Sequence, residues 1–254
     1  MIQITNLSKT YRTNQAKKYR MLMPDWQTIK AVDDVSFNCS PGRIFSLLGP
    51  NGAGKTTILR IIATILKPTR GSVEVSGYNT VENALDVRKQ IGFITASTGL
   101  YDRLTVNELI NYFGKLHHIN NVALKESRND LYTMLEMKSF ADRKIGELST
   151  GMRQKVSVCR ALLHDPEVVI FDEPTVGLDV ISTQSIIEII RKCKTQNKTV
   201  IFSTHNMSEV ELLSDDLAII HKGKLLFNDT YESMKKQMKS ASLVEEFIRI
   251  IKSN

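Results

Sequence analysis

A glycine-rich segment in the first quarter of the chain has the composition of a phosphate-binding loop. Residues 49–56 read Gly-Pro-Asn-Gly-Ala-Gly-Lys-Thr, two fixed glycines followed by a lysine and a hydroxyl residue. Glycines leave backbone N–H groups open to phosphate oxygens and permit positive φ angles. The helix expected next adds unpaired N–H groups and the positive end of its dipole. The predicted nucleotide ligands are Gly49, Pro50, Asn51, Gly52, Ala53, Gly54, Lys55, Thr56 and Thr57.

Two adjacent carboxylates end a second apolar run. Residues 168–171 read Val-Val-Ile-Phe, and Asp172 and Glu173 follow them. The carboxyl ends of parallel strands meet at one edge of a sheet, so we expect both acids beside the phosphate loop. His205 follows the next predicted strand and is expected at the same edge.

These residue types suit phosphoryl transfer to water. We predict that Lys55 reaches the β- and γ-phosphates, while Thr56 and Asp172 hold Mg²⁺, Asp172 directly or through water. Glu173 is expected to orient and polarise the attacking water. His205 is expected to bridge that water and the γ-phosphate. The predicted catalytic residues are therefore Lys55, Glu173 and His205.

Alternating strands and helices are predicted to position these residues. The expected strands cover residues 43–48, 72–75, 91–94, 168–171, 199–203, 217–221 and 225–227, and the expected helices cover 54–66, 105–117, 125–135, 151–164, 179–193 and 207–213. Thr105 and Glu108 have the spacing of a capping box. Only helices are expected between residues 98 and 166, so the pattern indicates a mostly parallel α/β core interrupted by a helical insertion.

Composition narrows the class of protein. The 254 residues are 42% hydrophobic and 24% charged, which is ordinary for a folded α/β protein. We expect neither a membrane-spanning helix nor a secretory signal, because no apolar run is long enough and the first residues alternate like a strand. The net charge of +7 does not select a partner. Cys39, Cys159 and Cys193 are widely spaced, which indicates neither a metal site nor a disulfide framework.

Together with the phosphate loop and the two acids, further motifs make nearly the whole chain resemble an ATP-binding cassette (ABC) protein. Residues 148–154, Leu-Ser-Thr-Gly-Met-Arg-Gln, look like the family's signature motif. Residues 177–179, Gly-Leu-Asp, look like the loop that follows the catalytic acids, and Tyr11 resembles the aromatic residue that stacks on adenine. The form of the signature is similar to that of the sodium-extruding NatA type, and residues 242–247 are similar to the ends of exporter subunits.

The resemblance implies a fold and its subdivision. The expected fold is a P-loop NTPase (RecA-like) core with an N-terminal antiparallel β subdomain and an inserted α-helical subdomain. Residues 1–254 are expected to form one nucleotide-binding domain. Its parts would be the ATP-binding core (1–97 and 167–228), the helical signature subdomain (98–166) and a C-terminal helical extension (229–254).

The resemblance also implies partners. Two nucleotide-binding domains pair head to tail, as a homodimer or a heterodimer, so that ATP lies between one phosphate loop and the other signature. Ser149, Thr150 and Gly151 would then contact the nucleotide of the partner subunit. A separately encoded ABC-type permease would span the membrane, and this chain would sit at the cytoplasmic face and power export, with Na⁺ and drugs as candidate cargoes. No nucleic acid partner is expected.

Three departures from the family pattern stand out. Ala96 occupies the position of a magnesium-contacting glutamine, and Thr95, Ser97 and Thr98 are its candidate substitutes. The signature lacks its second adjacent glycine and has Met152 in place of glutamine. Residues 13–30 form an insertion, containing Lys17, Lys18, Arg20 and Trp26. We favour a solvent-exposed hairpin extension for it over a membrane or partner contact.

Two other functions remain open at this point. The first is a non-transport ABC ATPase of translation or DNA repair, although such proteins generally carry two cassettes or a long inserted element. The second is a module that holds ATP without hydrolysing it, which the altered signature and Ala96 would suit. Glu173 and His205 argue against the second hypothesis, because both expected catalytic positions are filled.

Overall fold

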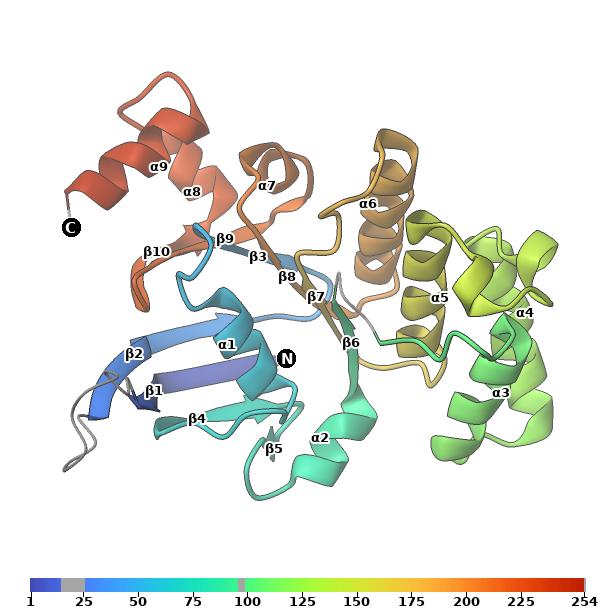
Figure 1. The fold of residues 1–254 in the computed structure, drawn as a ribbon. Helices are drawn as coiled ribbons and strands as arrows, with labels where there is room; N and C mark the ends of the chain where they lie inside the picture. The colour runs from blue at the N-terminus through green and yellow to red at the C-terminus, as the bar shows by residue number, and fades with distance from the viewer. Residues whose placement is uncertain (15–25, 96–98, 254) are drawn as a thin grey trace, which may run out of the picture.

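Two β-sheets form the centre of the molecule (Figure 1). The structure is a computed structural model that describes residues 1–14, 26–95 and 99–253. The larger sheet has the order β10-β9-β3-β8-β7-β6 and is parallel except for β10, which pairs antiparallel with β9. Its strands are β3 (Ile44–Leu48), β6 (Ile91–Thr95), β7 (Val168–Asp172), β8 (Thr199–Thr204), β9 (Asp216–His221) and β10 (Lys224–Thr230).

The smaller sheet is antiparallel and has the order β2-β1-β4-β5. Its strands are β1 (Ile2–Asn14), β2 (Trp26–Cys39), β4 (Arg70–Val75) and β5 (Tyr78–Asn79). The α/β class and the antiparallel N-terminal sheet expected from the sequence are therefore confirmed.

Helices cover the larger sheet and extend to one side of it (Figure 1). They are α1 (Lys55–Ile62), α2 (Ala84–Gln90), α3 (Val106–Leu116), α4 (Asn121–Met134), α5 (Thr150–Leu162), α6 (Val180–Thr195), α7 (Met207–Leu213), α8 (Tyr231–Gln237) and α9 (Leu243–Lys252). Two short 3₁₀ helices, Lys138–Phe140 and Ile145–Glu147, join α4 to α5. The capping box of Thr105 and Glu108 is present, and Asp179 accepts from the Ser182 N–H as the N-cap of α6.

Two helix ends differ from the predicted ones by about four residues. The first helix stops at Ile62 rather than near residue 66, because Thr64 adopts a left-handed φ of 61° and breaks the hydrogen-bond ladder. Leu66 still packs against the core, so its apolar character extends the helical pattern past the helix end. The fourth helix starts at Asn121, ahead of the predicted residue 125, because the Asn120 side chain caps it by accepting from the Ala123 N–H.

The central strands are buried along their whole length. Every residue of β3, β7 and β8 is buried, including Phe45, Phe171 and Phe202. Strands covered on both faces read as continuous apolar runs, which is why the sequence showed runs rather than alternation. Their carboxyl ends lie at one edge, where the chain leaves the sheet at residues 49, 173 and 205.

Two histidines stack where α5 meets the sheet. The rings of His117 and His164 are parallel within 7° with centroids 4.0 Å apart, and His164 Nε2 lies 3.2 Å from the Ile91 carbonyl oxygen. Burial, with a smaller contribution from His117, lowers the pKa of His164 to about 4. His164 is therefore neutral in the folded protein at pH 7.

We expect this histidine to make the protein less stable in mild acid. Between the ordinary pKa of 6.5 and the folded value of about 4, the unfolded chain binds a proton that the folded chain does not. The free energy of unfolding should therefore fall by up to about 2 kcal/mol between pH 7.5 and pH 5. Urea unfolding of wild type and His164→Gln at both pH values measures this, because Gln can still donate to Ile91. Parallel pH profiles for the two proteins would contradict it.

Candidate nucleotide-binding site

The phosphate loop joins β3 to α1 and lies close to other backbone. Gly54 has φ 110°, and a Cβ there would lie 2.3 Å from the Ala31 carbonyl oxygen. Gly52 also has a positive φ, 79°, but a Cβ there would meet nothing within 4 Å. The loop is thus held against β2 at one glycine and is open at the other.

Gly54→Ala should therefore disable the loop, whereas Gly52→Ala should be milder. A side chain at Gly52 adds only left-handed strain of about 1–2 kcal/mol. At Gly54 the same strain combines with a backbone overlap, which should bring the loss to roughly 3 kcal/mol or more and displace the N-terminus of α1. Chemical unfolding and ATP titration of the two variants measure this. Equal losses would contradict the close approach to Ala31.

The Lys55 side chain points back toward the backbone of the phosphate loop. Lys55 is buried, and its Nζ donates to the carbonyl oxygens of Gly49 at 2.6 Å and Pro50 at 3.2 Å. The same Nζ is 3.0 Å from Glu173 Oε1. The ammonium group therefore lies between the loop and the second carboxylate of β7.

Asp172 lies on the other side of the α1 N-terminus. Its Oδ1 accepts from Thr56 Oγ1 at 3.0 Å and from Ser203 Oγ at 2.7 Å, and its side chain is buried. Hydroxyl and carboxylate oxygens are the ligand types that Mg²⁺ takes in nucleotide sites. The pair Thr56–Asp172 thus fits the metal, with phosphate and water supplying the remaining oxygens.

Glu173 links the lysine to the histidine. Its Oε2 is 2.6 Å from His205 Nδ1, and its backbone N–H donates to Ser203 Oγ at 3.0 Å. Glu173 has a left-handed φ of 50°, which turns the chain sharply at the end of β7. The structure therefore brings Lys55, Glu173 and His205 together at the strand ends.

A buried glutamate that the sequence did not single out supports both strand ends. Glu209, in the first turn of α7, accepts from Thr175 Oγ1 and Thr204 Oγ1, each at 2.6 Å. These threonines lie next to the Glu173 turn and to His205. The helix dipole favours an acid in the first turn of any helix, so the position of Glu209 in the sequence did not mark it as part of the site.

The signature residues lie apart from this pocket. A cavity of about 150 Å³ is lined by Ala31, residues 51–57 and Glu173, and Ser149, Thr150 and Gly151 do not line it. Ser149 accepts from the Met152 N–H as the N-cap of α5, and both Ser149 and Thr150 are exposed. Within one copy, then, the signature does not close over the phosphate loop.

Another contact that the sequence did not reveal ties the signature helix to the acids. The buried Gln154 of α5 donates from Nε2 to the Pro174 carbonyl oxygen at 3.2 Å, one residue after Glu173. A displacement of α5 would therefore act on the backbone beside Glu173. Because the contact joins residues of different elements, no spacing in the sequence could predict it.

The remaining predicted residues lie either away from the cavity or outside the described residues. Tyr11 is partly buried on β1 opposite Ile29, with Lys9 Nζ 5.3 Å from its ring centroid, and it does not line the cavity. The predictions for Ala96, Ser97, Thr98, Lys17, Lys18, Arg20 and the Trp26 side chain lie outside the described residues.

The sequence of this chain is similar to those of known proteins of one family. Residues 32–176 match the sequence profile of the ABC transporter family. The chain is 40% identical over 244 residues to the ABC transporter ATP-binding protein NatA of Bacillus subtilis (strain 168), covering 96% of this chain and 95% of NatA. It is 36% identical over 209 residues to the bacitracin transport ATP-binding protein BcrA of Bacillus licheniformis, covering 82% and 67%.

Solved structures show the same fold. The structure of an ATP-binding subunit of an ABC transporter superposes with TM-score 0.84 at 24% identity, covering 99% of each chain. The ATP-binding cassette MJ0796, a dimer in a post-hydrolysis state with ADP and Pi, superposes with TM-score 0.78 at 25% identity, covering 91% of this chain and 98% of that one. The P-loop NTPase fold is thus confirmed, and the chain belongs to the ABC transporter family, as one of its ATP-binding subunits.

Proposed function

We propose that this chain hydrolyses ATP to drive export through a separate membrane protein. The observation that carries the proposal is the position of Glu173, whose two carboxylate oxygens contact Lys55 of the phosphate loop and His205. A carboxylate held in this way beside a phosphate loop suits the activation of water against a γ-phosphate. A module that only held ATP would not need it.

The proposed roles of the site residues combine their contacts with the family resemblance. Lys55 binds the β- and γ-phosphates, and residues 49–57 enclose them with backbone N–H groups. Thr56 and Asp172 hold Mg²⁺, which neutralises phosphate charge when bound. Glu173 is the general base, His205 orients its carboxylate and the water, and Tyr11 supports the adenine.

Two copies complete the site. Ser149, Thr150 and Gly151 lie at the exposed N-terminus of α5, away from the phosphate-loop cavity of their own chain. We propose that they contact the γ-phosphate bound by the partner subunit, since a helix N-terminus with free N–H groups attracts an anion. The dimeric state of the similar cassette supports this arrangement.

The relatives of this chain support a membrane partner. No helix within the described residues is long and apolar enough to cross a bilayer. NatA and BcrA, to which this chain is similar, are named as ATP-binding proteins of transport systems. We therefore propose an ABC-type permease as partner. We also propose that residues 1–254 form one nucleotide-binding domain at the cytoplasmic face of the membrane. Its core, signature subdomain and C-terminal extension would have the boundaries predicted from the sequence. A role in translation or DNA repair has no support among these relatives.

Affinity purification from gently solubilised membranes tests this function. A tagged copy of the chain should recover a polytopic membrane protein in near-equal amount, identified by mass spectrometry. A tagged Glu173→Gln copy is the matched sample, since it should recover the same partner without turnover. Recovery of ribosomes or nucleic acid in place of a membrane protein would overturn the proposal.

A further inference from the structure

Helix α9 has an exposed apolar stripe beside its buried face. Val244 and Ile248 are 49% and 46% exposed, and we call these two residues the α9 stripe. Their spacing places them on one side of the helix. Leu243 and Phe247 lie on the adjoining side and are buried in a cluster with residues of α7, α8 and β9. The helix is therefore apolar over a wider arc than its own chain covers.

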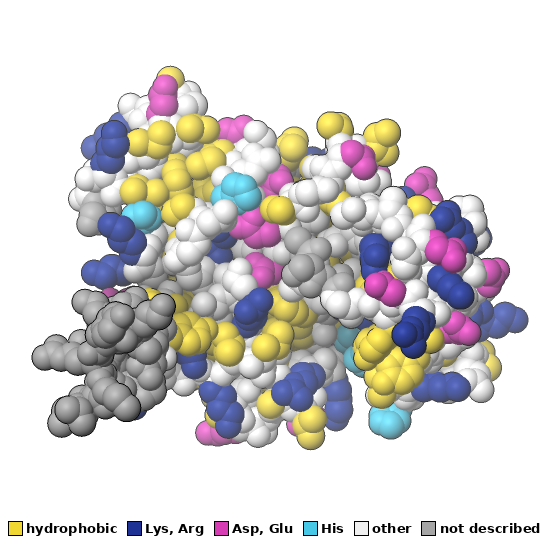
Figure 2. Space-filling model, viewed as in Figure 1, with side chains coloured by type: hydrophobic (Ala, Val, Ile, Leu, Met, Phe, Trp, Pro, Cys, Tyr) yellow, Lys and Arg dark blue, Asp and Glu magenta, His cyan; other side chains and the backbone are white. Residues whose placement is uncertain are grey.

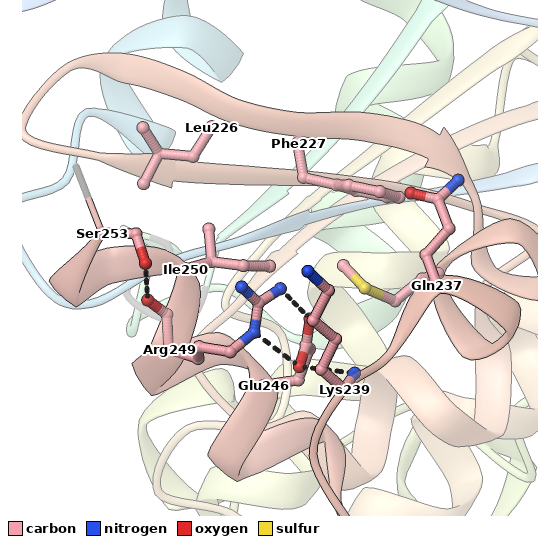
Figure 3. A pocket seen from close by; sticks show the side chains of 9 residues that line it. Leu226, Phe227, Gln237, Lys239, Glu246, Arg249, Ile250 and Ser253 are labelled. Atoms are coloured by element: carbon pink, nitrogen blue, oxygen red, sulfur yellow. Dashed lines mark hydrogen bonds and ion pairs between the residues drawn. The ribbon is translucent and has the colours of Figure 1, made fainter.

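The opposite flank of α9 is already engaged within the chain. It borders a groove of about 480 Å³, lined by Leu226 and Phe227 of β10 and by residues in and beside α8 and α9 (Figure 3). In that groove Arg249 Nε donates to Glu246 Oε2 at 3.0 Å, and the Lys239 N–H donates to the same oxygen at 3.1 Å. The bond from Lys239 ties α9 to the segment that joins it to α8, whereas the Arg249–Glu246 pair lies within α9.

Apolar side chains gather over the α8–α9 end of the molecule, with Lys and Arg side chains at the margin (Figure 2). Two exposed charges border the stripe. Glu245 lies about one turn before Ile248 and Lys252 about one turn after it, both on the same flank. An acid at the first turn and a base at the last also follow the helix dipole.

This pattern is complementary to itself. If two α9 helices pack antiparallel about a two-fold axis at Ile248, the stripes meet, and each Glu245 faces Lys252 of the partner subunit. The antiparallel dipoles add to the attraction. A self-complementary patch of this kind is what an isologous dimer contact requires.

We infer that two copies of this chain pair through the α9 stripe in this antiparallel arrangement. The contact is separate from the nucleotide site, because no residue of the stripe lines the phosphate-loop cavity. It therefore forms without ATP and holds two copies together when the nucleotide sites are open.

Cysteine cross-linking tests the contact directly. The native cysteines Cys39, Cys159 and Cys193 are buried, so an introduced cysteine dominates the reaction. Oxidised without nucleotide, Ile248→Cys should cross-link most of the protein into a dimer, because the two-fold axis brings the two positions together. Val122→Cys, at a 70% exposed position on α4, is the matched control and should remain monomeric. Ile248→Cys combined with Lys55→Met should cross-link equally, which separates this contact from ATP binding.

Charge exchange tests the orientation. Glu245→Lys and Lys252→Glu should each raise the dimer dissociation constant by roughly tenfold in sedimentation without nucleotide, and an equal mixture should restore dimers as mixed pairs. Circular dichroism confirms that α9 and the fold persist. Failure of Ile248→Cys to cross-link above the control, or of the mixture to recover, would overturn the inference. So would an Ile248→Asp protein that sediments like wild type but no longer recovers a membrane protein.

Discussion

Glu173→Gln should abolish most ATP hydrolysis while leaving ATP binding in place. The amide has nearly the same size and keeps a contact with Lys55 or His205, but it cannot accept a proton from water. Loss of a positioned general base lowers kcat by about 10²–10⁴-fold. The Kd for ATP should change by no more than a few-fold, because the loop residues that bind phosphate are unchanged. Phosphate release and equilibrium binding of ATP measure the two quantities separately.

Glu188→Gln is the matched control for this variant. Glu188 is exposed on α6, and its only hydrogen bond among the described residues is with Gln184 in the same helix. Its activity should equal that of wild type. A Glu173→Gln protein that retained a tenth or more of the wild-type kcat would show that another group activates the water.

Lys55→Met should weaken ATP binding itself. Met keeps most of the buried apolar stem but removes the ammonium group that lies 2.6 Å from the Gly49 carbonyl oxygen and 3.0 Å from Glu173. Removing one partner of a buried charge pair costs about 2–5 kcal/mol, so the Kd for ATP should rise by roughly 100-fold or more. Isothermal titration with Mg-ATP measures the change, and hydrolysis should be lost with it.

Lys89→Met supplies the comparison at an exposed site. The Lys89 side chain is 71% exposed and pairs with Asp86 on the surface. Its removal should leave both ATP affinity and hydrolysis unchanged, since exposed ion pairs contribute little. An ATP affinity of Lys55→Met within fivefold of wild type would contradict the assignment of Lys55 to the phosphates.

The parts of the fold that local chemistry determines were predicted from the sequence. The phosphate loop, the buried strand before Asp172 and the cap at Thr105 each depend on residues within a few positions of one another. Strand ends at one edge follow from parallel pairing, so the meeting of Lys55 with Glu173 could be expected before the structure was known.

The rest depends on contacts between distant segments. Glu209 binds threonines from two different loops, and Gln154 reaches Pro174 across the α5–β7 boundary. Neither contact corresponds to a recognisable spacing of residues in the sequence. Short elements such as α2, with Val87 as its buried residue, carry too little periodicity to be predicted. The α9 stripe likewise required knowledge of which apolar face the chain covers.

The measurement that most directly tests the account is hydrolysis by a mixture of two inactive variants. Lys55→Met removes the phosphate-binding lysine, and Ser149→Asp places a negative charge where the signature meets the γ-phosphate of the partner subunit. Asp is as good an N-cap as Ser, so α5 should stay intact. Each variant alone should be inactive, because both of its sites are damaged.

In a mixed dimer, both defects fall in one site and the other site is intact. With equal amounts and random pairing, half of the dimers are mixed, so the mixture should regain about a quarter of wild-type activity. That recovery would establish a nucleotide site shared between Lys55 of one copy and Ser149 of the other. No recovery above the separate variants, with mixed dimers shown to form, would contradict the shared site.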